Sequence, residues 1–251
     1  MTIDFPGSCQ IPALRALWQQ AFGDTDAFLE DFFAFAFSPD RCRCVTQDGA
    51  VIAALYWFNC TWEGKPLAYI YAVATDWAFR GQGLCRMLME NTHAHLKEQG
   101  YCGCILVPGS PGLFELYEKL GYSICSHIRE FECTAGVPIS LRQLTAAEYA
   151  ALRRQYLPSG SVVQEQETLA LLQTHSCFYA GENCLLVCAP DGEKLVIGEL
   201  LGAPEAAPGV VAALGYPRGK VRTPGGERPF AMYRSLTDDP NAPKYFGLAL
   251  D

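Results

Sequence analysis

The stretch "FRGQGLCR", from Phe79 to Arg86, decides how the rest of the sequence is interpreted. Gly81 and Gly83 stand one residue apart, and Arg80 and Arg86 flank them. The apolar run "LAYIYAVAT" before this stretch predicts a buried strand, and "LCRMLMENTHAHLKEQG", which overlaps its end, predicts a helix. The first amides of a helix lack intrahelical partners, and the helix dipole adds positive potential at that end. A strand, a glycine-containing loop and a helix in this order therefore form a suitable anion site.

The loop alone leaves two interpretations open. It lacks the third glycine of the dinucleotide fingerprint, and it lacks the lysine followed by serine or threonine of the P-loop. It is either a phosphate-binding loop or an ordinary turn that opens a helix. The surrounding sequence has to separate the two.

The first half of the chain alternates between helical and extended patterns. Two helices are predicted between residues 12 and 37, the second rich in phenylalanine, which packs in the core or forms an aromatic wall beside a substrate. A hairpin with a turn at Asp48-Gly49 follows, and a second turn begins at Glu63-Gly64. A strand at residues 102–108, a helix at 110–121 and a strand at 123–133 complete this half. The pattern predicts an α+β fold.

The helix after the glycine loop carries its apolar residues at helical spacing. Leu84, Met87, Leu88 and Leu96 are predicted to share one buried face. Gly100 stands where a C-terminal cap is expected.

The second half repeats the order of the first without its loop. A helix begins after Thr145, which forms a capping box with Glu148, and a hairpin, a long strand, a helix and two strands follow. This order hints at a duplicated fold. No equivalent of the glycine-arginine loop occurs here, and the basic stretch "YPRGKVRTPGGERP" is predicted to be a solvated loop.

Composition excludes several classes of function. The chain has 251 residues, and 27 acidic against 19 basic residues give a net charge of -8, which disfavours nucleic acid and mildly favours an amine-bearing substrate. No segment is long and apolar enough to span a membrane, and the first residues lack a secretory signal, so a cytoplasmic protein with reduced thiols is expected. Among the 12 cysteines, the pairs Cys42/Cys44 and Cys102/Cys104 do not have the usual zinc spacing. No metal site is predicted.

The wider stretch "AVATDWAFRGQGLCRMLM" resembles the acetyl-coenzyme-A signature of the GNAT superfamily of N-acetyltransferases, whose core is Arg/Gln-x-x-Gly-x-Gly/Ala. Arg80 and Gly83 match this pattern, while Cys85 stands where the family has glycine or alanine. Downstream, "LYEKLGY" at residues 116–122 resembles the second landmark of the family, a tyrosine followed by a turn that ends in glycine and an aromatic residue. The resemblance covers residues 10–135 and implies the GNAT acyl-CoA N-acyltransferase fold, an α/β arrangement with a mixed central sheet flanked by helices.

The resemblance also implies how this chain binds acetyl-CoA as a co-substrate. The backbone of Val73, Ala74 and Thr75 is expected to bind the pantetheine arm. The loop and helix start are expected to hold the pyrophosphate; these residues are Arg80, Gly81, Gln82, Gly83, Leu84, Cys85 and Arg86. The asparagine that the family often has before its tyrosine is Ser110 in this chain, which leaves one cofactor contact open.

Tyr117 is the implied catalytic residue, a proton donor to the departing thiolate, although a tyrosine here could instead pack in the core. The implied mechanism is direct attack of a neutral amine on the thioester, so Cys85 need not be a nucleophile. The general base is unassigned. Asp76 is one candidate, and the terminal carboxylate of Asp251 is another, by likeness to multidomain GNAT enzymes.

The sequence therefore predicts a GNAT acetyltransferase domain at residues 1–138 and a smaller GNAT-like α+β domain without a cofactor signature at residues 139–251. The expected activity is acetyl transfer to a primary amine of a small molecule, and the second domain is expected to shape the acceptor cleft. The alternative is a non-catalytic acyl-CoA-binding or regulatory module. The acceptor and the oligomeric state are left open.

Overall fold

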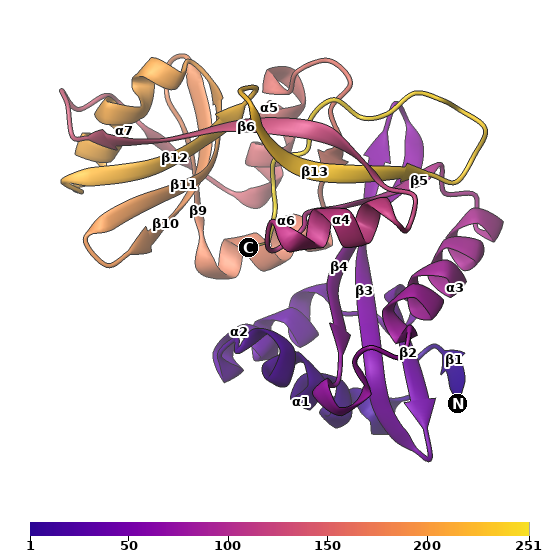
Figure 1. The fold of residues 1–251 in the computed structure, drawn as a ribbon. Coiled ribbons are helices and arrows are strands. Elements are labelled where there is room, and N and C mark those ends of the chain that lie inside the picture. The colour runs from indigo at the N-terminus through magenta and orange to yellow at the C-terminus, as the bar shows by residue number, and fades with distance from the viewer. Residues whose placement is uncertain (251) are drawn as a thin grey trace. The chain divides into compact units, whose positions relative to one another are not determined.

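The computed structural model describes residues 1–250, and the chain divides into two compact units (Figure 1). Unit 1 comprises Met1–Ser123 and Met232–Asn241; unit 2 comprises Ile124–Ala231 and the chain from Ala242 onward. Their boundaries fall inside strands β6 and β13. We describe each unit by itself.

Unit 1 contains the helices α1 (Ile11–Phe22), α2 (Asp26–Asp31), α3 (Leu84–Glu98) and α4 (Gly112–Glu118), with the short helix η4 (Trp77–Phe79) and a π-helical turn at Phe32–Ala36. Its strands are β1 (Thr2–Asp4), β2 (Cys42–Gln47), β3 (Ala50–Trp62), β4 (Lys65–Thr75) and β5 (Gly103–Leu106), and β13 (Arg228–Ser235) ends in this unit. They lie in the order β1-β2-β3-β4-β5-β13, with β4 and β5 parallel.

The predicted hairpin turns of unit 1 are confirmed. Asp48 and Gly49 join β2 to β3 with φ of 51° and 83°, and Glu63 and Gly64 join β3 to β4 with φ of 51° and 75°. Two successive residues in this left-handed region give the turn whose twist matches antiparallel strands.

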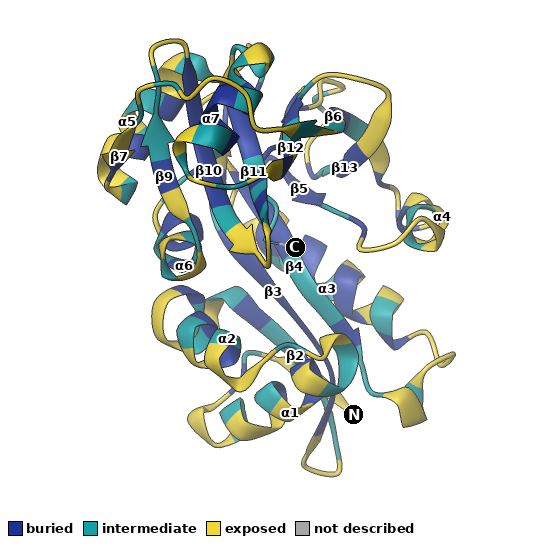
Figure 2. Cartoon of the chain, turned by 90° about the vertical axis from the view of Figure 1, so that its left-hand side faces the viewer, coloured by how far each residue is buried: buried dark blue, intermediate teal, exposed yellow. Residues whose placement is uncertain are grey.

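The sheet of unit 1 is covered on both faces, with α1 and α2 on one side and α3 on the other (Figure 1). β3 is buried along most of its length (Figure 2), because both of its faces are packed. On the α1 face, Trp18, Phe32, Tyr56 and Tyr71 form an aromatic cluster; the Trp18 and Phe32 ring centroids are 4.5 Å apart. The phenylalanine-rich helix is thus partly core, although Phe35 is 52% exposed.

The buried face of α3 differs from the prediction. Leu84, Leu88 and Leu96 are buried as expected, but Met87 is 37% exposed. Thr92 and His93 are buried instead. Hydrogen bonds allow these two polar side chains to be buried: Thr92 Oγ1 donates to Leu88 O, and His93 Nε2 lies 2.7 Å from the Tyr122 hydroxyl.

The burial of His93 predicts a pH-dependent stability. Burial, with a smaller effect of Arg234, lowers the pKa of His93 from 6.5 to about 3. Between pH 6.5 and about pH 3, the unfolded chain therefore binds a proton at His93 that the folded chain does not. As the pH drops through this range, the free energy of unfolding falls by ~1.4 kcal/mol per pH unit. Urea titrations at pH 7 and pH 5 should show wild type losing ~2 kcal/mol more than His93→Gln. Equal losses in the two proteins would contradict the assignment.

Unit 2 contains the helices α5 (Ala146–Tyr156), α6 (Glu167–His175) and α7 (Ala207–Ala213), with the short helix η5 (Pro204–Ala206). Its strands are β6 (Ser123–Thr134, from Ile124), β7 (Arg142–Leu144), β8 (Val163–Gln164), β9 (Cys177–Ala180), β10 (Cys184–Asp191), β11 (Lys194–Gly202) and β12 (Arg218–Pro224). The main sheet has the order β6-β12-β11-β10-β9-β7. The predicted capping box of α5 is confirmed: the Thr145 and Glu148 side chains each accept a hydrogen bond from the other residue's backbone N–H.

The basic stretch of the second half is not the solvated loop that the sequence predicted. Its cations lie mainly on β12 and β13, and Glu130 on β6 pairs with Lys220, Arg222 and Arg228 at 3.0, 3.9 and 2.7 Å. These cations already have an acidic partner.

The two units share one strand–helix–strand plan. In unit 1 the parallel strands β4 and β5 are joined through α3; in unit 2 the parallel strands β11 and β12 are joined through α7. Both helices end in the same way: Gly100 has φ of 82° and precedes Tyr101, and Gly215 has φ of 80° and precedes Tyr216. Each tyrosine N–H bonds a carbonyl five residues earlier, and each glycine N–H bonds one three residues earlier, which is the Schellman motif.

Each unit is completed by a strand from the opposite half of the chain. β5 pairs in antiparallel fashion with Met232–Ser235 of β13, which follows the strands of unit 2 in sequence. β12 pairs with Ile128–Thr134 of β6, which follows the strands of unit 1. Unit 1 therefore depends on residues near the C-terminus.

None of the helices in residues 1–250 is long and apolar enough to cross a membrane.

Candidate cofactor and active site

The end of β4 carries backbone that β5 does not pair. β4 pairs with β5 only at Leu67–Tyr69, but it continues to Thr75. The register with β3 shifts opposite Leu55, and Ala72 adopts a φ of 47° there. Such a bulge bends a strand and ends its pairing. The predicted pantetheine-binding residues Val73, Ala74 and Thr75 follow immediately.

Asp76 closes this strand as a capping residue. Its Oδ1 accepts the Ala78 N–H at 2.8 Å at the start of η4, and its Oδ2 lies 3.4 Å from Gln20 Nε2. The sequence offered Asp76 as a candidate general base, but its contacts are those of a cap; the other candidate, Asp251, lies outside the described residues.

The glycine loop presents open backbone to solvent. Gly81 and Gly83 have φ of 79° and 78°, which side-chain-bearing residues rarely adopt, and a Cβ at either position would meet nothing within 4 Å. Gly83 is the N-cap of α3, and the first intrahelical bond runs from the Met87 N–H to Gly83 O at 3.0 Å. The amides of the preceding turn, Leu84 to Arg86, have no acceptor within the helix. This is the geometry of an anion site at the start of a 15-residue helix.

The two arginines of the loop are held differently. Arg80 Nε donates to Thr75 O at 3.3 Å, and its guanidinium lies over the Trp77 ring, 5.8 Å from the centroid. Arg86 lies 3.8 Å from Glu90, and both side chains are more than half exposed. An exposed pair of this kind stabilises little, so the guanidinium of Arg86 can turn to another anion.

Tyr117 lies at the end of α4, where "LYEKLGY" forms a Schellman motif. Tyr122 N donates to Tyr117 O at 3.0 Å, Gly121 N donates to Glu118 O at 2.9 Å, and Gly121 has φ of 82°. The Tyr117 and Tyr122 rings meet edge to face with centroids 5.8 Å apart, which supplies the apolar contact of the motif.

Tyr117 is brought together with Cys85 in the first turn of α3. Tyr117 is 7% exposed and belongs to the apolar core against which Cys85 packs. Burial, and next the negative charge that Cys85 carries when it ionises, raise the pKa of Tyr117 well above its usual value, so the phenol stays protonated. Burial also raises the pKa of Cys85, which keeps it a thiol, unlike a nucleophilic cysteine.

Unit 2 has no counterpart of the glycine loop. Four residues, Arg80 to Gly83, separate η4 from α3, whereas η5 ends at Ala206 and α7 begins at Ala207. α7 has 7 residues, against 15 in α3. The connection that would hold a phosphate is therefore missing from unit 2.

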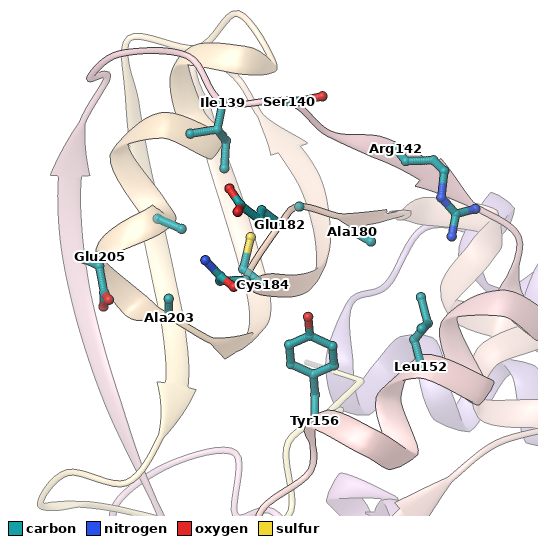
Figure 3. Close-up of a pocket in the computed structure, with 13 residues that line it drawn as sticks. Ile139, Ser140, Arg142, Leu152, Tyr156, Ala180, Glu182, Cys184, Ala203 and Glu205 are labelled. Atoms are coloured by element: carbon teal, nitrogen blue, oxygen red, sulfur yellow. The ribbon is translucent and has the colours of Figure 1, made fainter.

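Unit 2 does contain an open pocket of about 770 Å³ (Figure 3). In the figure, the Tyr156 hydroxyl points into it from α5. The lining comes from the segment before β7, from α5, from the β9–β10 turn and from η5; these residues are Ile139, Ser140, Arg142, Leu152, Tyr156, Ala180, Gly181, Glu182, Asn183, Cys184, Ala203, Glu205 and Ala206. The predicted cofactor residues are not among them.

A buried ion pair in unit 2 was missed by the sequence analysis. Arg153 binds both carboxylate oxygens of Glu199 at 2.7 and 2.9 Å, and Glu199 also accepts from the hydroxyls of Tyr149 and Tyr245 at 2.8 and 2.9 Å. Although burial raises the pKa of Glu199, the charge and hydrogen bonds of Arg153 outweigh it and lower this pKa overall. The available signal was an acidic residue inside the apolar strand "LVIGELLG".

The closely spaced cysteines are buried thiols, and none of the 12 cysteines forms a disulfide. Within residues 1–250, no group of three or more His, Cys, Asp or Glu side chains is arranged to hold a metal ion.

Comparison with known proteins defines the class of fold. The structure is similar to a GCN5-related N-acetyltransferase from Kribbella flavida, at 20% identity and a TM-score of 0.73 over 93% of this chain and 70% of that one. It is also similar to a GCN5-related N-acetyltransferase from Anabaena variabilis, at 15% identity and a TM-score of 0.72 over 94% and 73%. A probable N-acyltransferase from Enterococcus faecalis matches at 16% identity and a TM-score of 0.69 over 94% and 72%. The fold is the GNAT fold, as predicted.

Residues 7–125 match the family model of the acetyltransferase (GNAT) domain. The match covers just under half of the chain and identifies residues 7–125 as an acetyltransferase (GNAT) domain, a family whose chemistry is acyl transfer. No curated protein matches the sequence.

Proposed function

We propose that the chain is an acetyl-CoA-dependent N-acetyltransferase that acts on the primary amine of a small molecule in the cytoplasm. The observation that carries the proposal is the end of β4, which β5 does not pair, beside the open Gly81–Gly83 loop and the first turn of α3. An extended amide-containing arm fits the backbone of Val73–Thr75, and a pyrophosphate fits the free amides after Gly83.

Acetyl-CoA supplies an activated thioester for direct attack by a neutral amine, and the residues of unit 1 bind and orient it. Val73, Ala74 and Thr75 bind the pantetheine arm through their backbone, and the loop from Arg80 to Arg86 holds the pyrophosphate. Such fixed orientation removes much of the entropic cost of bringing two reactants together. Tyr117, kept protonated by burial, donates a proton to the departing sulfur.

We further propose that residues 1–138 carry the acetyl-CoA domain, which Met232–Ser235 of β13 complete, and that the rest of residues 139–251 form a GNAT-like domain without a cofactor site. The direct connection of η5 to α7 supports the second assignment. The -8 net charge is compatible with an amine substrate. The acceptor classes to be tested are polyamines, amino sugars and amino acids.

A non-catalytic acyl-CoA-binding module is the rival function. The burial of Tyr117 and the capping contacts of Asp76 favour it, because neither group is freely exposed to a substrate.

A thiol-release assay with acetyl-CoA and a panel of amines tests the proposal. Wild type should release coenzyme A with at least one amine, and Tyr117→Phe should lower kcat about 100-fold without weakening coenzyme A binding. Gly83→Glu should abolish coenzyme A binding for two reasons. The carboxylate places negative charge at the anion site, and a residue with a side chain is strained at the φ of 78° that Gly83 adopts. Gly64→Glu, with φ of 75° and the same open surroundings, is the matched control and should bind normally.

The results separate the functions. Coenzyme A binding without turnover of any amine would favour the binding module. Normal binding by Gly83→Glu would contradict the cofactor site itself.

A further inference from the structure

One exposed aromatic residue lies, in the sequence, between the proposed pantetheine strand and the phosphate loop. Trp77 is 62% exposed, whereas Trp18, Trp57 and Trp62 are 1%, 3% and 2% exposed. It follows Thr75 by two residues and precedes Gly81 by four. Single exposed apolar residues are common on protein surfaces, so exposure alone means little. The position and the contacts of Trp77 give it meaning.

The indole of Trp77 is held in place by the chain around it. η4 runs from Trp77 to Phe79, and Asp76 caps it through the Ala78 N–H at 2.8 Å. The backbone that carries the indole is therefore fixed to the end of β4, where the Asp76 N–H also bonds Ile52 O at 2.9 Å. A fixed aromatic ring loses little freedom when a flat ligand stacks on it.

Arg80 links this ring to the anion site. Its Nε bonds Thr75 O at 3.3 Å, and its guanidinium carbon lies 5.8 Å from the Trp77 ring centroid. Neither of these two contacts is a hydrogen bond from an Nη group of Arg80, so these groups can donate to phosphate. The guanidinium lies over one face of the ring, which leaves the other face for a base to stack on, and an aromatic ring with a nearby guanidinium commonly binds a nucleobase attached to phosphate.

The cofactor has matching chemistry. Coenzyme A joins its pantetheine arm through a pyrophosphate to an adenosine 3′-phosphate. With the arm on β4 and the pyrophosphate at the start of α3, the adenosine lies just beyond the loop. We propose that Trp77 and Arg80 form the adenosine subsite, with the purine stacked on the Trp77 indole and Arg80 contacting a phosphate beside it. This inference rests on the proposed function. It predicts that coenzyme A, which carries the adenosine, binds more tightly than its pantetheine half alone.

The subsite predicts that the two halves of coenzyme A respond differently to one substitution. Base–aromatic stacking is typically worth 1–3 kcal/mol, which corresponds to about 5- to 150-fold in affinity. Trp77→Ala should raise the Kd for coenzyme A and for adenosine 3′,5′-bisphosphate by about tenfold or more. It should leave the Kd for 4′-phosphopantetheine unchanged, because that half does not reach the indole. Trp77→Phe, which keeps an aromatic face, should recover most of the affinity.

Calorimetric titrations of the full chain with these three compounds make the test. Trp77 is the exposed tryptophan among the four in the chain, so its fluorescence should be quenched by coenzyme A and by the bisphosphate but not by 4′-phosphopantetheine. Phe35→Ala removes an aromatic ring of similar exposure, 52%, and is the matched control that should bind like wild type.

The outcomes distinguish the subsite from the proposed function. If coenzyme A binds wild type and Trp77→Ala equally well, or if Trp77→Ala weakens both halves equally, the subsite is overturned and the acetyltransferase proposal stands. If wild type binds none of the three compounds, both are overturned.

Discussion

Arg153→Met is expected to lower the free energy of unfolding by about 3–5 kcal/mol at pH 7, because it leaves a buried carboxylate without its cation. Both side chains of the pair are almost wholly buried, and Arg153 is the cation that lowers the pKa of Glu199. The hydroxyls of Tyr149 and Tyr245 remain as donors, but they carry no charge. Urea unfolding monitored by circular dichroism measures the loss.

The contribution of Glu199 to the pH dependence of stability should change sign in this variant. In wild type the pKa of Glu199 is lowered, so its contribution is present at neutral pH and is lost as the pH falls through the acid range. Without Arg153, burial raises that pKa, so between pH 7 and pH 5 the variant should regain stability relative to wild type as Glu199 takes up a proton, while the loss due to His93 is common to both. The double variant Arg153→Met/Glu199→Gln should recover a large part of the loss. Equal stability of the single variant and wild type would contradict a structural role for the pair.

Residues 1–138 alone are expected not to form a stable unit. This fragment lacks Met232–Ser235, which pair with Gly103–Leu106 of β5. Within this segment Met232 is fully buried in the core beside α3, and the Tyr233 ring covers Gly103 so closely that a Cβ there would clash with it. An unpaired edge strand above an open core favours aggregation. The fragment should show no cooperative thermal transition.

Co-expression with residues 139–251 is the matched control, because that fragment supplies the missing strand. The two fragments should purify together and unfold cooperatively, and the single fragment should do neither. A soluble 1–138 fragment with a Tm close to that of the full chain, and with coenzyme A binding, would show that the strand is dispensable and would support the domain limits predicted from the sequence.

The parts of the fold that the sequence predicted depend on local backbone chemistry. Asp48-Gly49 and Glu63-Gly64 define hairpin turns through their positive φ values, and Thr145 with Glu148 defines a helix start. The glycine loop was found in the same way, since Gly81 and Gly83 take conformations that few other residues adopt.

The parts that were not predicted depend on contacts between distant residues. No local pattern says that β13 pairs with β5, because any apolar strand could take that edge. The helical pattern alone would place His93 and Arg153 on the surface. Both are buried because Tyr122 and Glu199, which are distant in sequence, bind their polar groups. The roles of Tyr117 and of the loop residues remain predictions, as do the domain limits.

Cys85, the residue at which the loop departs from the family pattern, also affects the redox behaviour of the site. Each turnover of the proposed reaction would release a thiol close to Tyr117, and Cys85 packs against the same core. Mixed disulfides form through thiolates, and burial keeps Cys85 protonated. Cys85 should therefore not form a mixed disulfide with oxidised coenzyme A, although it lies close to the thiol product. The exposed Cys9 and Cys177 would react first.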